Sequence, residues 1–319
     1  MVASTAIADI SKIGTNLIIF IIFSSHFFQI VDTLLRPKGP LPFLLATDTT
    51  AVKKPVAPVL LSNSATRHLR EHAARITSNG TYSEIAMADN IPMTISPRHL
   101  LRELSTFRSV ARVAVARHRE PVAMAAGEPV MAVPGFGFGD LAMTALRRQL
   151  RKAGFTDLKW GLGTNKGDVP SLLPRLIDQI ERAVAVHDQP IRLVGWSLGG
   201  YLAREAARER PDLVNQVITL GSPIKGGPKY TAAASAYKWL GWDLDAIEAK
   251  VEERESVALQ TPVTYIWSKR DGVVDWRATQ DLDDTSATNI EVDCSHMAMI
   301  FDPMVNHIVM TQLRRSLID

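Results

Sequence analysis

The fold of this chain is decided by the stretch Pro190-Ile191-Arg192-Leu193-Val194-Gly195-Trp196-Ser197-Leu198-Gly199-Gly200-Tyr201. Its apolar first half predicts a short strand, and the helix-forming residues that follow predict a helix. Between them lies the pattern Gly-x-Ser-x-Gly, with Ser197 between Gly195 and Gly199. A strand that turns directly into a helix crowds its own backbone, so residues without a Cβ are needed beside the serine. The turn therefore presents the Ser197 hydroxyl next to the free N–H groups of the helix, unless it is only a packing turn.

The composition limits the class of protein and the kinds of partner and site that this chain can have. The chain has 319 residues, of which 46% are hydrophobic and 22% charged, as expected for a globular protein with a full core. A net charge of +3 is too small to indicate a nucleic-acid partner. The single cysteine, Cys294, excludes an internal disulfide and a cysteine-based zinc site.

Residues 13–35 contain an apolar run, residues 17–23, followed by polar residues. A membrane-spanning helix needs about 20 mostly apolar residues, so the run is marginal for that role. Polar residues fall on one helical stripe, which predicts an amphipathic helix: Ser25, Gln29, Asp32 and Arg36. We expect this segment to contact a membrane surface or to pack on the rest of the protein. A helix that spans the membrane is the less favoured alternative. No signal-cleavage pattern follows it, so a cytoplasmic or membrane-associated location is favoured over secretion.

The chain divides into three predicted parts. Residues 1–37 form the hydrophobic or amphipathic N-terminal segment, and residues 38–127 form a linker and an arginine-rich helical extension. The arginine-rich helix that opens at Ser96 has either a solvated polar face or a patch for anionic lipid. Residues 128–319 form an α/β domain.

Strands and amphipathic helices alternate regularly through this last part. Strands are predicted over residues 130–133, 158–160, 191–196, 216–220, 263–267 and 290–292, with helices from residues 170 and 302. A further helix is predicted to be capped by Asp140, to face Leu141, Leu146 and Leu150 inward, and to stop at Gly154. Short apolar strands separated by helices predict a mostly parallel sheet covered on both faces.

One insertion, residues 224–261, interrupts this alternation. Inserted segments at the carboxyl edge of a parallel sheet usually shape the ligand site. Its tryptophans, Trp239 and Trp242, favour an apolar lid over a helix that merely covers the core. We assign these two residues, with Trp196 beside the serine, to substrate binding.

A serine nucleophile needs a base and a group that orients the base. Of the eight histidines, only His296 follows the carboxyl end of a predicted strand before any helix has begun. Asp271 follows the strand that ends at Trp267 and is predicted to turn inward as the orienting acid. Asp275 is the rival, and either aspartate could serve only as a turn or cap residue.

Donors for a developing oxyanion are predicted in the glycine-rich loop after the first strand, Val133-Pro134-Gly135-Phe136-Gly137-Phe138-Gly139. The backbone N–H of Phe136 can join that of Leu198 to form an oxyanion hole. A nucleotide-binding Gly-x-Gly-x-x-Gly would require a third glycine at Asp140, where a carboxylate would repel a pyrophosphate. We therefore reject a nucleotide site.

These residues together resemble the α/β-hydrolase superfamily, in particular its bacterial serine lipase and esterase-like branch. The similarity covers roughly residues 128–319 and rests on Val133-Pro134-Gly135-Phe136-Gly137, Trp160-Gly161-Leu162-Gly163, Gly195-Trp196-Ser197-Leu198-Gly199-Gly200, Leu220-Gly221-Ser222-Pro223, Asp271-Gly272-Val273-Val274 and Ser295-His296. One departure is Pro134, where many lipases carry a histidine.

The resemblance implies an α/β-hydrolase fold with a helical N-terminal extension and a short lid. It implies an enzyme that cleaves carboxylic esters of small acyl or lipid substrates through an acyl-enzyme at Ser197, with no metal and no organic cofactor. The same residues fit an acyltransferase or a thioesterase. An inactive, membrane-associated binding protein that keeps only the fold is the remaining alternative.

Overall fold

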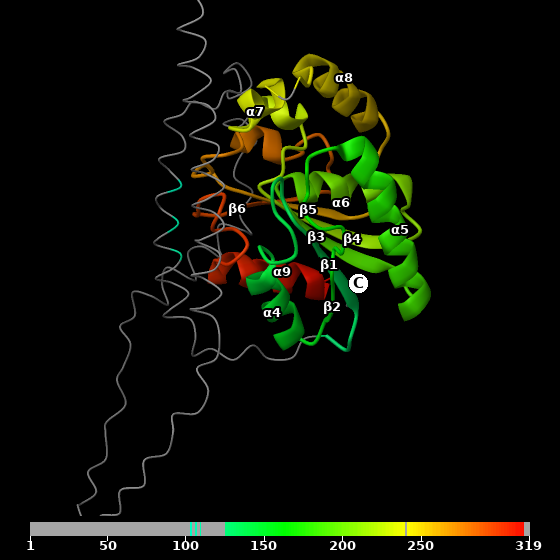
Figure 1. The fold of residues 1–319 in the computed structure, drawn as a ribbon. Coiled ribbons are helices and arrows are strands. Elements are labelled where there is room, and N and C mark those ends of the chain that lie inside the picture. Colours follow the sequence, from blue (N-terminus) through cyan, green and yellow to red (C-terminus); the bar gives the residue numbers. More distant parts are fainter. Residues whose placement is uncertain (1–102, 104–105, 107–108, 110–124, 240, 316–319) are drawn as a thin grey trace, which may run out of the picture. The chain divides into compact units, whose positions relative to one another are not determined.

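The computed structural model describes residues 103, 106, 109, 125–239 and 241–315 (Figure 1). The predicted N-terminal segment, including residues 13–35, lies outside the described residues, as does nearly all of the part predicted at 38–127. Within the described part, no helix combines the length and the apolar character that a membrane span requires.

The core of the described domain is a six-stranded sheet with the order β2-β1-β3-β4-β5-β6. All neighbouring strands in it are parallel, which confirms the predicted parallel sheet. The strands are β1 (Pro129–Val133), β2 (Thr156–Leu158), β3 (Ile191–Trp196), β4 (Val214–Leu220), β5 (Val263–Trp267) and β6 (Thr288–Glu291). Strands β2, β4 and β6 each begin two residues earlier than the sequence indicated.

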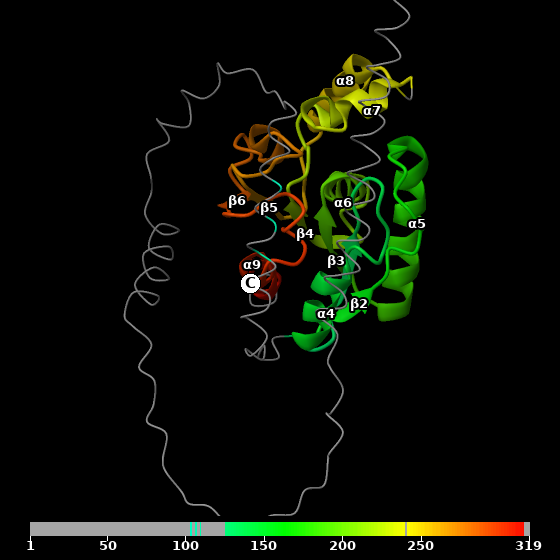
Figure 2. The same ribbon diagram turned by 60° about the vertical axis from the view of Figure 1, so that its left-hand side comes forward.

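Helices cover both faces of this sheet, as Figures 1 and 2 show. Helices α4 and α9 pack on one face, and α5 and α6 pack on the other. Strand β1 is apolar on both sides because Val130 and Ala132 belong to the first core, whereas Met131 and Val133 belong to the second. The helices are α4 (Thr144–Lys152), α5 (Val169–His187), α6 (Leu198–Glu209), α7 (Ala234–Trp239), α8 (Leu244–Glu255) and α9 (Pro303–Arg315), with 3₁₀ helices η3 (Gly227–Tyr230) and η4 (Trp276–Thr279).

The strand order reverses between β1 and β3, because the chain first adds β2 on one side of β1 and then β3 on the other. Loops that leave the carboxyl ends of strands at such a switch point diverge and form a crevice. Here the two loops remain in contact at their bases: a Cβ on Gly135 would lie 3.1 Å from the Cβ of Ser197. The topology therefore brings the glycine-rich loop and the serine together.

The prediction that Asp140 caps the first helix was wrong. Helix α4 begins at Thr144, no side chain caps it, and Leu141 is 87% exposed instead of facing inward. The Asp140 carboxylate is used elsewhere, since it accepts hydrogen bonds from the backbone N–H groups of Trp160 (3.1 Å) and Gly161 (3.2 Å). It therefore holds the loop that follows β2.

Candidate active site

Ser197 occupies a strained turn between β3 and α6. Its φ of 55° is one of two positive values among the non-glycine residues of the described part, and such a conformation is costly for a residue with a Cβ. The flanking glycines make the turn sterically feasible. A Cβ on Gly195 would come closer than 3.0 Å to Gly200, and a Cβ on Gly199 would come closer than 3.0 Å to the Val133 carbonyl oxygen.

Asp271 and His296 form a buried pair at the carboxyl edge of the sheet. The Oδ2 atom of Asp271 lies 2.7 Å from Nδ1 of His296, and each residue is 2% exposed. The other oxygen, Oδ1, accepts hydrogen bonds from the backbone N–H groups of Val273 and Val274, both at 2.8 Å. The carboxylate is therefore held by its own turn, and in neutral His296 the proton sits on Nδ1, which leaves a lone pair on Nε2.

The rival aspartate has a different role. The Asp275 side chain accepts a hydrogen bond from the Arg277 backbone N–H at 3.0 Å, as the N-cap of η4. It also pairs with the Arg277 guanidinium at 2.7 Å. Of the two candidates, Asp271 is the one that contacts His296.

The surroundings of His296 favour its protonated form. Burial alone lowers the pKa of the imidazole, but the charge and hydrogen bond of Asp271, together with the charge of Glu103, outweigh it. The net effect raises the pKa of His296 above its ordinary value of 6.5. Such a base can hold a proton taken from a hydroxyl.

Trp196, the residue before Ser197, contacts His296 and so places the serine and the histidine close together. The Trp196 and His296 rings have centroids 5.4 Å apart, and the Trp196 indole N–H donates to the His296 carbonyl oxygen at 3.2 Å. Within residues 125–239 and 241–315, no hydrogen bond joins the serine hydroxyl to the imidazole. Trp196 itself is only 1% exposed and packs beside His296. Its role in substrate binding stays a prediction.

The glycine-rich loop after β1 is organised by a residue that sequence reasoning missed. Asn165, fully buried, donates from its side chain to the Pro134 carbonyl oxygen at 2.9 Å. Its backbone accepts from the Gly137 N–H (2.7 Å) and donates to the Phe138 carbonyl oxygen (2.8 Å). These bonds fix the turn that carries Phe136. The only sequence signal was an asparagine between two glycine-rich stretches.

The second oxyanion candidate is the N–H of Leu198, the first residue of α6. The first N–H groups of a helix have no partner within it and point out of its positive end. This N–H is therefore available to a negatively charged oxygen bound beside Ser197.

The inserted segment packs against both oxyanion candidates. The Phe136 and Tyr237 rings lie with centroids 5.2 Å apart, and Trp242 packs edge-on against Tyr237 at 5.9 Å. Leu198 shares a small apolar cluster with α8 residues, including Val251. In both views α7 and α8 lie together at one end of the domain (Figures 1 and 2). The side chain of Trp239, also predicted to bind substrate, lies outside the described residues.

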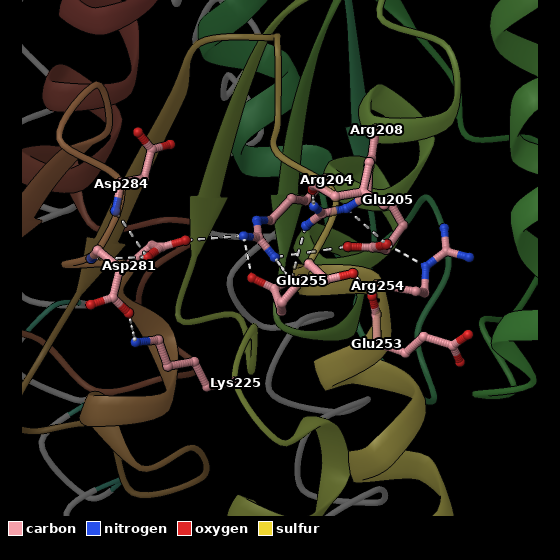
Figure 3. A network of polar contacts seen from close by, with 12 residues as sticks. Arg204, Glu205, Arg208, Lys225, Glu253, Arg254, Glu255, Asp281 and Asp284 are labelled. Atoms are coloured by element: carbon pink, nitrogen blue, oxygen red, sulfur yellow. Dashed lines mark hydrogen bonds and ion pairs between the residues drawn. The ribbon is translucent and has the colours of Figure 1, made fainter.

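A buried network of charges ties this insertion to the helix that follows the serine (Figure 3). Arg204 of α6, only 2% exposed, pairs with Glu255 at the end of α8 and with Asp281 at 3.1 Å. Arg254 of α8 pairs in turn with Glu205 and Glu209 of α6. Since a buried charge without its partner is costly, these pairs fix α8 relative to α6.

Metal ligation has no visible basis in this site. Among the residues that the structure describes, no group of three or more histidine, cysteine, aspartate or glutamate side chains could hold a metal ion. The acidic and basic side chains of the site bond to each other and to the backbone instead.

A parallel sheet in this order, with a serine on the sharp turn after β3 and a buried Asp–His pair after β5 and β6, has the α/β-hydrolase fold. No protein-family model and no curated protein matches the chain. Among solved structures, a monoacylglycerol lipase of Paleococcus ferrophilus is similar at 18% identity and a TM-score of 0.47, over 60% of this chain and 96% of that one. The lipase BlEst2 of Bacillus licheniformis is similar at 17% identity and a TM-score of 0.47, over 61% and 94%.

A putative non-heme bromoperoxidase of Mycobacterium tuberculosis, BpoC, is similar at 15% identity and a TM-score of 0.46, over 63% of this chain and 98% of that one. Proteins of this fold catalyse different reactions, so the likeness says nothing about which reaction this chain performs. The function has to be argued from the site.

Proposed function

We propose that this protein is a serine hydrolase that cleaves carboxylic esters through a covalent acyl-enzyme. The observation that carries the proposal is the buried Asp271–His296 pair at the edge of the sheet where the strained turn presents Ser197. Hydrogen bonds in unliganded sites are often long and tighten when substrate binds, so the lack of a Ser197–His296 bond is compatible with this role.

In the first half-reaction His296 Nε2 takes the proton from the Ser197 hydroxyl while the oxygen attacks the ester carbonyl carbon. Asp271 stabilises the imidazolium and keeps the ring in the required orientation. The carbonyl oxygen becomes negatively charged and accepts hydrogen bonds from the N–H groups of Phe136 and Leu198. The intermediate collapses, the proton passes from His296 to the leaving alkoxide, and the acyl group remains on Ser197.

In the second half-reaction water replaces the alcohol. His296 takes a proton from water, the hydroxide attacks the acyl carbon, and the acid leaves as the proton returns to Ser197. An alcohol or a thiol could take the place of water, which would give an acyltransferase, and a thioester substrate would give a thioesterase. Product analysis with an added alcohol and with a thioester substrate separates these outcomes.

The inserted segment supports an apolar acyl group as the substrate. Tyr237 packs against Phe136, and Trp242 packs edge-on against Tyr237. Helix α8 contributes Ile247 and Val251 to the cluster around Leu198. A substrate carbonyl bound at the two oxyanion candidates would therefore lie next to aromatic and aliphatic side chains. We propose that residues 224–261 act as the lid of this site.

The test is hydrolysis of a series of p-nitrophenyl esters by the full chain and by Ser197→Ala. We expect wild-type activity and a loss of at least about 10³-fold in the variant, because the nucleophile is absent. The matched control is Ser286→Ala, which removes an exposed hydroxyl and should leave the rate unchanged. Equal activity of wild type and Ser197→Ala in correctly folded protein would contradict the proposal.

A further inference from the structure

Glu103 joins the two loops that carry the acid and the base. It lies upstream of the sheet domain, yet its Oε1 accepts hydrogen bonds from the backbone N–H groups of Gly272 (2.9 Å) and His296 (3.0 Å). Its Oε2 accepts from the Met297 N–H at 3.0 Å. One side chain therefore bonds to the residue after Asp271 and to the backbone of His296 itself.

A carboxylate is well suited to this position. The three donors come from two separate loops, and only an ionised carboxyl group offers two oxygens that accept on both sides without presenting a donor. An amide side chain of the same size would replace one acceptor with an NH₂ group facing a backbone N–H. That would break at least one of the bonds to His296 or Met297.

The neighbouring contacts repeat at helical spacing. Thr106 Oγ1 lies 2.5 Å from Ser295 Oγ, and Ser109 Oγ donates to the Asp302 carboxylate at 2.5 Å. With Glu103 these residues are spaced by three, as expected of one face of a helix. This face is seated on the chain from Ser295 to Asp302, immediately behind the base.

We propose that Glu103 is a positioning residue of the hydrolase site: it locks the Asp271 turn to the His296 loop and so holds the acid–base pair in register. This proposal rests on the proposed function. It also gives the segment before residue 128 a role, because it supplies a group that the site needs. Small displacements of a reacting group can cost large factors in rate, so the effect should appear in kcat.

The charge of Glu103 also affects the pKa of His296. A shift in the pH profile would therefore distinguish a positioning role of Glu103 from mere packing of its segment on the domain. The titratable groups that face His296 are Asp271 and Glu103. Burial and the charge of Asp271 raise the pKa of Glu103, while His296 and the two backbone donors of Met297 and Gly272 lower it in part. Removing the Glu103 charge should therefore lower the pKa of His296 and move the acidic limb of kcat/KM to lower pH.

The experiment compares wild type with three test variants of the full chain, Glu103→Gln, Glu103→Asp and Thr106→Val, and with one charge control. The first substitution removes the charge and one acceptor at nearly constant size, and the second keeps the charge. The third removes a hydroxyl contact of the same helical face without touching His296. Each form is checked by thermal unfolding and assayed well below its Tm for kcat, KM and the pH profile of p-nitrophenyl ester hydrolysis. Glu181→Gln removes the charge of an exposed carboxylate on α5 and is the charge control.

We expect kcat of Glu103→Gln to fall by about ten- to a hundredfold with KM nearly unchanged, and its acidic limb to shift to lower pH. Glu103→Asp should recover the wild-type limb, and Thr106→Val and Glu181→Gln should keep both kcat and the profile. The inference is overturned if Glu103→Gln matches wild type, or if Thr106→Val loses as much activity as Glu103→Gln, which would reveal a docking role only. If wild type itself shows no Ser197-dependent hydrolysis, it is the proposed function that fails.

Discussion

The Oδ2 atom of Asp271 lies 2.7 Å from Nδ1 of His296, and the two residues come from loops that leave neighbouring strands, β5 and β6. Both side chains are shielded from solvent. A carboxylate in this position selects the tautomer with a free Nε2 and stabilises the ring when it becomes charged. The reactivity that we propose for Ser197 depends on this pair.

Asp271→Asn should reduce kcat by about 10⁴-fold while the protein stays folded, since an amide favours the wrong tautomer of His296. Asp275→Asn is the matched control: it weakens the cap of η4 and the pairing with Arg277 and should lower Tm slightly, with kcat intact. Steady-state kinetics and thermal unfolding of the two variants measure this contrast. Equal losses of kcat in Asp271→Asn and Asp275→Asn would show that Asp271 is not the acid of the site.

The activity should depend on pH through His296. The free base is the active form, and its pKa is raised above 6.5, so kcat/KM should increase with pH through a midpoint above 6.5. A group whose pKa is raised by folding stabilises the fold when protonated. Its contribution to the free energy of unfolding is therefore complete below 6.5 and is lost as pH rises through the raised value. A midpoint below 6.5 in the kcat/KM profile would contradict the described surroundings of His296.

Asn165→Ala should lower kcat by about tenfold or more, because the loop that carries Phe136 loses the bond to the Pro134 carbonyl oxygen. The loss of hydrogen bonds of a buried group should also cost about 1–3 kcal/mol of stability. Asn289→Ala removes an amide that donates to Asp281 away from the site, so it should lower Tm without changing kcat. Kinetics and Tm of both variants test the prediction. A normal kcat in Asn165→Ala would show that Asn165 is not needed to hold the oxyanion loop.

Arg204→Met should destabilise the domain by about 3–5 kcal/mol, because it leaves carboxylates of a buried network without their partner. Arg204 pairs with Glu255 and Asp281, and its Nε donates to the Tyr265 hydroxyl at 2.8 Å. Arg210→Gln breaks the exposed pairs with Glu181 and Asp212 and should leave the unfolding midpoint nearly unchanged. Urea unfolding of the two variants makes the comparison. A shift of similar size in both would mean that the buried network adds little.

The parts of the site that the sequence could predict are those with a local signal. The turn at Ser197 needs glycines at fixed positions because backbone atoms approach there from both sides, and that requirement is readable from spacing. His296 and Asp271 could be singled out because each follows the carboxyl end of a predicted strand in a parallel sheet. Their hydrogen bond was not itself readable from the sequence.

Other parts carry no such signal. Asp140 looked like a helix cap because it precedes an amphipathic stretch, but its carboxylate bonds to the loop after β2. The hydrogen bond from the Trp196 indole to the His296 carbonyl oxygen joins residues 100 positions apart and could not be predicted from the sequence. Glu103 lies in an arginine-rich stretch of the sequence, and its partners lie 169 or more residues away. Contacts at such separations depend on the whole topology.

The most direct test of the central claim is covalent labelling of the full chain with a fluorophosphonate, followed by intact-mass and peptide mass spectrometry. A hydroxyl activated by an adjacent imidazole attacks phosphorus and displaces fluoride, whereas ordinary serines do not react. The account predicts one adduct per chain, located on Ser197 and absent from Ser197→Ala and from His296→Ala. No adduct on folded wild-type protein, or an adduct on another residue that persists in Ser197→Ala, would contradict it.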